Sequence, residues 1–233
     1  MHSFSRWLCY AGILVLPAFV GAARASTLVF SNLGSPPAFD PEDGWTVDGG
    51  VAGGQMLAVA FTSAIGVTFE DAQLPLGIIV SNLSTSPLGV YLASNANGAP
   101  GADLANLSLA AGQTVGGWPP GNLVTYGCGV CPALHAGIEY WLVVDIPNLN
   151  QDYFASQAAW NWNTTQDYAS GANFAFNDTQ SGTGWQYLAG QPRPAFEIDG
   201  IATPEPGLIG LVAVGLALLA LNFRRASRRL HHS

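Results

Sequence analysis

The chain has 233 residues and a formal net charge of −8 at pH 7, because seven basic residues stand against fifteen acidic ones. An acidic surface repels polyphosphates, so nucleic acid is excluded as a partner. Charged residues make up only 9% of the chain, and 28 glycines and 15 prolines supply turn-forming positions, a composition typical of a secreted β protein.

Residues 1–25 have the parts of a secretory signal peptide. Arg6 gives a short basic start, residues 7–20 form an apolar core, and small residues lead to a cleavage site after Ala25. We therefore expect signal peptidase to cut there. Retention of the segment as an N-terminal membrane anchor is the alternative.

Residues 26–202 form the body of the protein. All of the acidic residues except Glu205 lie in it, whereas Arg193 is its only basic residue. Its length suits one domain with a sizeable core and is short for two.

Short segments rich in β-branched and aromatic residues recur along the body and predict strands. The predicted strands are residues 27–31, 55–62, 67–76, 78–83, 88–94, 104–109, 139–145, 158–164, 174–177, 185–188 and 195–198. Residues 139–145 are the clearest and should lie at the centre, while residues 35–54 read as a loop. Strands without an amphipathic helix between them predict an all-β, antiparallel sandwich, with a jelly roll as the preferred version.

Two cysteines remain after removal of the signal peptide, which contains Cys9. Cys128 and Cys131 are separated by two residues, and in an oxidising compartment this spacing predicts a small disulfide. A redox-active pair is the alternative, because the same spacing lowers a thiol pKa at a helix start. Zinc is less favoured, since only His135 lies near and a second pair of ligands is missing.

The densest acidic group lies in the loop predicted at residues 35–54. Its members are Asp40, Glu42, Asp43 and Asp48. Oxygen ligands that converge on a loop could bind calcium, but the alternation of an EF-hand loop is missing. A solvated acidic loop is the preferred interpretation, calcium is the alternative, and no other cofactor is indicated.

The second half of the body is rich in tryptophan and tyrosine. Trp160 and Trp162 are two positions apart, so in a strand they share one face. If that face is outward, the pair forms a platform for a sugar. If it is inward, the pair belongs to the core, and we prefer this because large aromatic side chains dominate such interiors.

Catalysis finds little support in the body. Its single histidine, His135, would have to serve any Ser-His-Asp or Cys-His site, and we expect it to be merely exposed. Glycoside hydrolysis needs two carboxylates at a set separation, but no motif singles out a pair. We therefore predict that the protein is not an enzyme, with a secreted glycan hydrolase as the least favoured alternative.

The final segment, residues 203–233, has three parts in a fixed order. Pro204, Glu205 and Pro206 come first, and the uncharged apolar residues 207–223 follow. The basic residues of the last part, 224–233, are Arg224, Arg225, Arg228 and Arg229.

The chemistry of each part indicates a membrane signal. At about 1.5 Å per residue, a helix over 207–223 approaches the bilayer core of about 30 Å. The arginines should stay in the cytoplasm, which places the body outside. Pro204 and Pro206 cannot continue a helix, so the motif is expected to be an extended segment that a protease could recognise.

This order of parts resembles the PEP-CTERM sorting signal of Gram-negative bacteria. The resemblance implies that a membrane-embedded exosortase recognises Pro204, Glu205 and Pro206 and cuts nearby. It also implies transient anchoring in the inner membrane, followed by transfer to the cell surface or the extracellular matrix. An ordinary C-terminal membrane anchor is the alternative.

The body resembles the choice-of-anchor R domains, extracellular β-rich domains found with different sorting tails. The similar stretches are residues 28–34, 58–62, 90–105, 136–144 and 184–187. The resemblance implies surface display and no established catalytic residues. We expect a non-enzymatic protein of the exopolysaccharide or biofilm matrix, with matrix polysaccharide as a partner and a carbohydrate-binding module as the alternative function.

Overall fold

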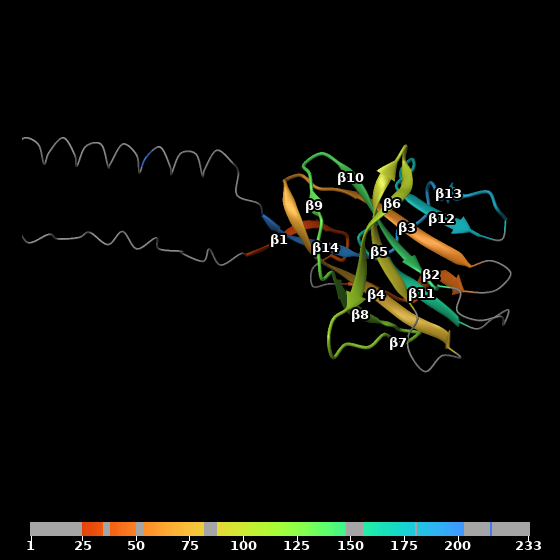
Figure 1. Cartoon of the computed structure of the whole chain (residues 1–233). Coiled ribbons are helices and arrows are strands. Elements are labelled where there is room, and N and C mark those ends of the chain that lie inside the picture. The colour runs from red at the N-terminus through yellow and green to blue at the C-terminus, as the bar shows by residue number, and fades with distance from the viewer. Residues whose placement is uncertain are drawn as a thin grey trace, which may run out of the picture.

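The computed structural model describes residues 25–34, 38–49, 54–81, 88–147, 156–179, 181–202 and 215. Within these ranges the chain forms fourteen β-strands (Figure 1), so the predicted all-β class is confirmed. The strands are β1 (Ser26–Ser31), β2 (Phe39–Gly49), β3 (Gln55–Thr62), β4 (Val67–Ser81), β5 (Gly89–Ala96), β6 (Ala99–Leu109), β7 (Gly116–Gly117), β8 (Asn122–Gly127), β9 (Ala133–Leu134), β10 (Glu139–Asp145), β11 (Ser156–Asn163), β12 (Phe174–Asp178), β13 (Trp185–Tyr187) and β14 (Glu197–Ala202).

Eight of these strands close into a barrel in which every neighbouring pair is antiparallel. From β4 the order is β11, β2, β3, β10, β5, β6 and β8, and β8 pairs with β4 again. The joint between β2 and β3 is narrow, since only Asp48 and Gln55 are paired there. Hydrogen bonding thus continues around the ring, and the predicted division into the two sheets of a sandwich or jelly roll is not confirmed.

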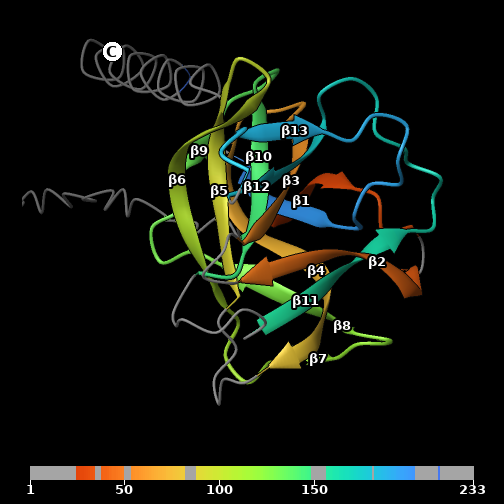
Figure 2. The same ribbon diagram turned by 90° about the vertical axis from the view of Figure 1, so that its right-hand side faces the viewer.

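The long strand β4 connects the barrel with both ends of the body. Its first half pairs with β14, and β14 pairs in turn with β1. Ser26 lies opposite Ile201, so the body begins and ends side by side (Figure 1). On the other side of the molecule, β12 pairs with the free edge of β3 and β13 pairs with β12 (Figure 2).

The central strands β3 and β10 are buried on both faces. Val59 and Leu142 lie opposite each other and belong to the large interior cluster. The adjacent pair, Ala58 and Val143, belongs to a second cluster on the outer face together with Trp141. Two covered faces explain why the sequence of β10 is an unbroken apolar run. The predicted central position of this strand is confirmed.

Strand β2 occupies much of the segment predicted as a loop. It pairs with β11 from Gly49 to Gly44 and again at Phe39, with a bulge between them, so the loop prediction is wrong for this strand. Asp, Pro and Gly lower the local strand preference, but the distant partner β11 supplies the hydrogen bonds that hold β2 extended. At Gly44 a side chain would not fit, because its Cβ would lie 2.9 Å from the carbonyl oxygen of Trp160.

The two processing signals fall outside the part of the chain that the structure describes. Of the predicted signal peptide, only Ala25 is described, and of residues 203–233 only Gly215. Among the described residues, no helix is both long enough and apolar enough to cross a bilayer.

Candidate functional site

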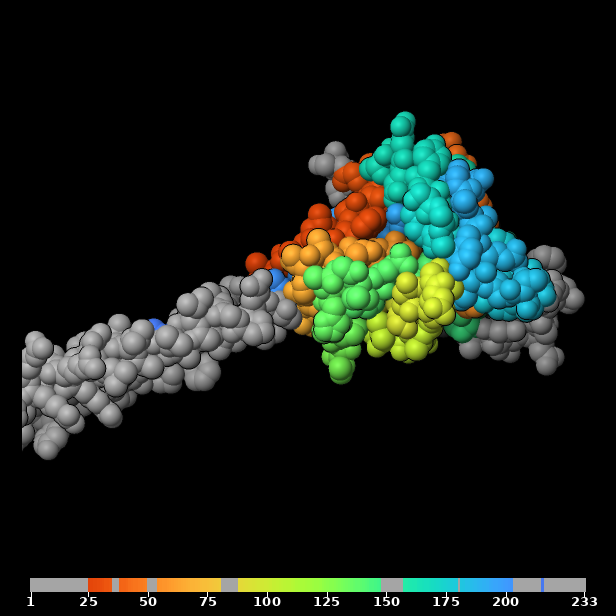
Figure 3. All heavy atoms as spheres, turned by 90° about the horizontal axis from the view of Figure 1, so that it is seen from above, coloured from red at the N-terminus to blue at the C-terminus, as the bar shows by residue number. Residues whose placement is uncertain are grey.

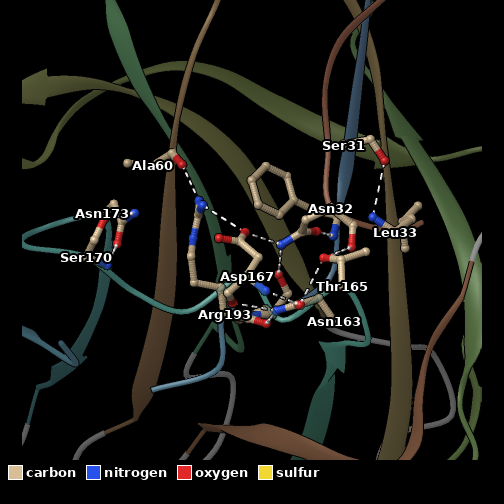
Figure 4. Close-up of polar contacts among 12 residues, drawn as sticks. Ser31, Asn32, Leu33, Ala60, Asn163, Thr165, Asp167, Ser170, Asn173 and Arg193 are labelled. Carbon is tan, nitrogen blue, oxygen red and sulfur yellow. Dashed lines mark hydrogen bonds and ion pairs between the residues drawn. The ribbon is translucent and has the colours of Figure 1, made fainter. Parts of the chain in front are cut away.

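The segment between β13 and β14 carries the single basic residue of the body into the interior. Arg193 lies between Pro192 and Pro194, which form isolated bridges with Tyr168 and Trp162. The prolines fix the backbone in an extended form. The side chain of Arg193 is only 4% exposed and extends from this segment toward β3 (Figure 4).

Both terminal nitrogens of the Arg193 guanidinium donate hydrogen bonds, whereas Nε is buried without a hydrogen-bond partner among the described residues. Nη1 donates to Oδ2 of Asp167 at 3.0 Å, and Nη2 donates to the carbonyl oxygen of Ala60. The guanidinium carbon lies 5.4 Å from the ring centre of Phe30 and 5.6 Å from that of Phe196. Burial lowers the pKa of Arg193, and the neighbouring Asp167 carboxylate opposes this effect.

Asp167 is held in turn by Asn32, which follows β1. The Asn32 side-chain amide donates to Oδ2 of Asp167 at 2.9 Å and to the carbonyl oxygen of Pro194 at 3.0 Å. Its oxygen accepts from the backbone N–H of Phe196 at 2.7 Å. Asn32 therefore ties the end of the first strand to the segment that carries Arg193.

Asn163 fixes the loop that positions Asp167. Its amide nitrogen donates to the carbonyl oxygens of Asp167 at 2.8 Å and Arg193 at 2.7 Å. Its oxygen accepts from the backbone N–H of Asp167 at 2.9 Å and from the hydroxyl of Thr165 at 3.1 Å. The hydrogen-bonding capacity of the side chain is thereby filled, which makes the loop rigid.

A pocket of about 460 Å³ opens beside this network. Its polar lining includes Ser31, Thr165, Asp167 and Glu197, and its apolar lining includes Leu28 and Phe30. The volume is within the range of small-molecule sites, roughly 300–1,000 Å³. Carboxylates and hydroxyls beside an apolar wall suit a neutral polyhydroxylated ligand such as a sugar. Arg193 also lines the pocket and is paired with Asp167, so Glu197 is the carboxylate that disfavours an anion.

Sequence reasoning did not identify this network. Asn32 and Asp167 are 135 positions apart, so nothing local connects them. The available signal was Arg193 itself, a lone basic residue between two prolines in an otherwise acidic body. An isolated charge in such a segment is a candidate for burial with a partner.

The predicted tryptophan pair does not form an exposed sugar platform. Trp160 is fully buried, and its indole N–H donates to the carbonyl oxygen of Ala195 at 2.8 Å. Trp162 is half-buried, and its ring centre lies 5.9 Å from that of Trp45. Because Trp160 has no free face for a sugar ring, the core interpretation holds for it.

The acidic residues considered for calcium do not converge. Asp40 uses Oδ1 to accept from the backbone N–H groups of Glu42 at 3.0 Å and Asp43 at 3.1 Å. Asp48 lies near the other end of β2, opposite Gln157, whereas Asp40 lies beside Phe39, which is opposite Asn163. Among the described residues, no three Asp, Glu, His or Cys side chains are arranged to hold a metal ion.

Cys128 and Cys131 form the predicted disulfide, with their Cα atoms 5.3 Å apart. They lie in the loop between β8 and β9, so the helix start that favours a redox pair is missing from this part of the described chain. Val130 at the tip of this loop is 91% exposed. His135 is exposed, as expected.

The predicted sorting residues and the arginines that follow them lie outside the described residues, so their predicted roles stay predictions. Comparison with protein-family models, with curated proteins and with solved structures found no match for the chain.

A second charged feature covers the outer face where β4 pairs with β14. Asp71 lies directly opposite Asp199, and Glu70 and Glu197 are close to both. One carboxylate oxygen each of Glu70 and Asp71 is buried without a hydrogen-bond partner. Burial, followed by the neighbouring Glu197, Asp71 and Glu70, raises the pKa of Asp199 from 3.8 to about 6. The pKa of Asp71 is also raised, mainly by burial.

These carboxylates should make the protein more stable in mild acid than at neutral pH. The folded state binds a proton at Asp199 more tightly than the unfolded state, so stability falls as the pH rises from 3.8 through about 6. We expect Asp199→Asn to raise the unfolding free energy at pH 7 by up to about 1 kcal/mol and to flatten this pH dependence. Urea titrations from about pH 4 to pH 7 measure both effects. Glu42→Gln, at an exposed position, is the control, and an unchanged profile for Asp199→Asn would contradict the assignment.

Proposed function

We propose that the protein is exported, transiently anchored in the inner membrane by residues 207–223, and released by an exosortase that cuts near Pro204, Glu205 and Pro206. The released body then acts at the cell surface or in the exopolysaccharide matrix, without catalysing a reaction. Signal peptidase frees the other end after Ala25. Delivery to the matrix is thus the core of the mechanism.

The position of the processing points relative to the strands carries this proposal. β1 begins at Ser26, directly after the predicted signal-peptidase site. β14 ends at Ala202, and only Thr203 separates it from Pro204. Cutting at both points leaves all fourteen described strands whole. A sorting signal needs this separation between a folded cargo and a removable tail.

Two further observations support export. The disulfide between Cys128 and Cys131 is typical of an oxidising compartment. Ser26 lies opposite Ile201, so both processing points lie at the same end of the body, which can face the membrane during both cuts.

Alteration of the motif tests the proposal. With Pro204, Glu205 and Pro206 all replaced by alanine, we expect the chain to remain full-length in the inner-membrane fraction of the native host, because the protease no longer has its extended recognition strap. Thr203→Ala is the matched control beside the motif and should be released normally. Normal release of the triple variant would count against exosortase processing.

Carbohydrate binding is a second candidate function, favoured by the pocket beside Arg193 rather than by the tryptophan pair. Glu197 lines the pocket on β14, and a carboxylate that binds a sugar hydroxyl contributes enough for about a tenfold change in affinity. We expect Glu197→Gln to weaken binding to purified matrix polysaccharide by about that factor. Glu42→Gln removes a similar charge outside this pocket and should bind normally. Equal binding by both variants would remove the support for this site.

A further inference from the structure

The two chain ends leave the barrel at an end that also carries two tight turns. Ala202 pairs with Val67, and Val67 pairs with Leu134, so the start of β4 lies between the end of β14 and β9. The turns are residues 63–66 and 135–138, and the backbone N–H of Gly137 donates to the carbonyl oxygen of Ser63 at 2.8 Å. We call this end, with both turns, the terminal pole. Figure 3 shows these segments next to one another at the end from which the chain termini depart.

The two turns of the terminal pole carry no carboxylate, although Glu139 directly follows the second turn. Residues 63–66 are Ser-Ala-Ile-Gly and residues 135–138 are His-Ala-Gly-Ile, and neither turn contains a carboxylate. Ile65 is 44% exposed and Ile138 is 49% exposed. Turns on a soluble surface usually carry polar residues, so an exposed isoleucine in each of two hydrogen-bonded turns is a distinctive feature.

Other exposed aliphatic residues lie close to the same end. Leu28 is on β1, 58% exposed, and Val130 is in the disulfide loop that leads to β9. The backbone N–H of Phe69 on β4 donates to the carbonyl oxygen of Pro132 at 2.9 Å, which holds this loop against the start of β4. Exposed apolar surface therefore borders the terminal pole on the side of the disulfide loop, whereas on the β1 side Leu28 lies opposite Asp199.

The length of the chain after Ala202 brings the terminal pole to the bilayer. Residues 203–207 are all that separate Ala202 from Leu208, where the apolar run begins. Five extended residues span at most about 18 Å, and the interfacial layer of a bilayer is itself several Å thick. Anionic lipids repel the acidic body, so a contact at this distance must be made by uncharged, apolar residues.

We propose that the terminal pole rests on the periplasmic face of the inner membrane while the tail is anchored, with Ile65 and Ile138 in the lipid headgroup region. This inference rests on the proposed function, because it requires residues 207–223 to be inserted. The contact sets the orientation of the barrel relative to the bilayer.

Site-specific fluorescent labels test the contact. The chain that retains residues 203–233 is reconstituted in vesicles of phosphatidylethanolamine and phosphatidylglycerol that contain a nitroxide-labelled lipid quencher. A label is attached in turn at Ile65→Cys, at Ile138→Cys and at Val80→Cys. Val80 is the matched control, since it is 41% exposed near the opposite end of β4. We expect several-fold stronger quenching at the two pole positions than at Val80.

A label at Ala217→Cys, within the predicted membrane segment, distinguishes a failure of the membrane contact from a failure of the anchoring. If this label is quenched but the pole labels are quenched no more than Val80, the membrane contact is wrong and the anchoring stands. If the Ala217 label is not quenched, the anchoring itself is wrong and the contact is lost with it. Shielding of the pole only when exosortase is added would assign the surface to a protein partner and would also overturn the lipid contact.

Discussion

Asp167→Ala should lower the free energy of unfolding of the body by about 3–5 kcal/mol, because it leaves the buried guanidinium of Arg193 without its ion pair. The change also removes the acceptor of the Asn32 amide at 2.9 Å, which joins β1 to the Arg193 segment. Denaturant titration of the purified body measures the loss. Asp43→Ala removes an exposed carboxylate on β2 and should stay within about 0.5 kcal/mol of the unaltered protein.

A double-mutant cycle separates the ion pair from the remaining contacts of each residue. Arg193→Met keeps much of the side-chain volume beside Phe30 and Phe196, so it removes the charge while retaining some packing. Combined with Asp167→Ala, it should be less destabilising than the sum of the single changes by about 1–3 kcal/mol. Additive effects would show that the two charges do not depend on each other.

Trp160→Ala should cost about 3–5 kcal/mol of unfolding free energy, the usual loss for a large aromatic side chain in a core. Trp160 is fully buried, its ring centre lies 6.4 Å from that of Phe196, and its N–H bond to Ala195 would be lost. Thermal or denaturant unfolding measures the effect.

Trp162→Ala is the matched comparison, because the half-buried Trp162 should cost clearly less. The two variants also separate stability from binding. Once corrected for the folded fraction, neither should affect polysaccharide affinity as Glu197→Gln does. A Trp160 variant of normal stability that had lost sugar binding would contradict the core assignment.

The sequence predicted the strands whose own residues strongly favour an extended conformation. β10 was predicted because its apolar run, with Trp141 and Val143, fits a strand that is covered on both faces. β2 was missed because Pro41, Glu42 and Asp43 disfavour a strand locally. They form a bulge, and β11, more than a hundred residues later, pairs with the residues on either side of it. Closure of the barrel depends on the single residue pair Asp48 and Gln55 between β2 and β3, which no local sequence pattern reveals.

At the candidate site, too, the sequence predicted only what neighbouring residues determine. The disulfide followed from spacing alone, because Cys128 and Cys131 are close in sequence. The Arg193 network unites residues from both ends of the body, and each of them is unremarkable in its own segment. Alternation along a strand places Trp160 and Trp162 on the same face of β11, but it does not tell whether that face points into the core or toward solvent. The acidic group was dense in sequence, but the extension of β2 separates Asp40 from Asp48.

The intact mass of the protein isolated from its native host tests the central claim most directly. Processing at both signals predicts a chain that begins at Ser26 and ends near Thr203, recovered at the cell surface or in the extracellular matrix. A mature protein that still carries residues 208–233 would contradict the account, because the apolar segment would then be a permanent anchor and the body would act at the inner membrane.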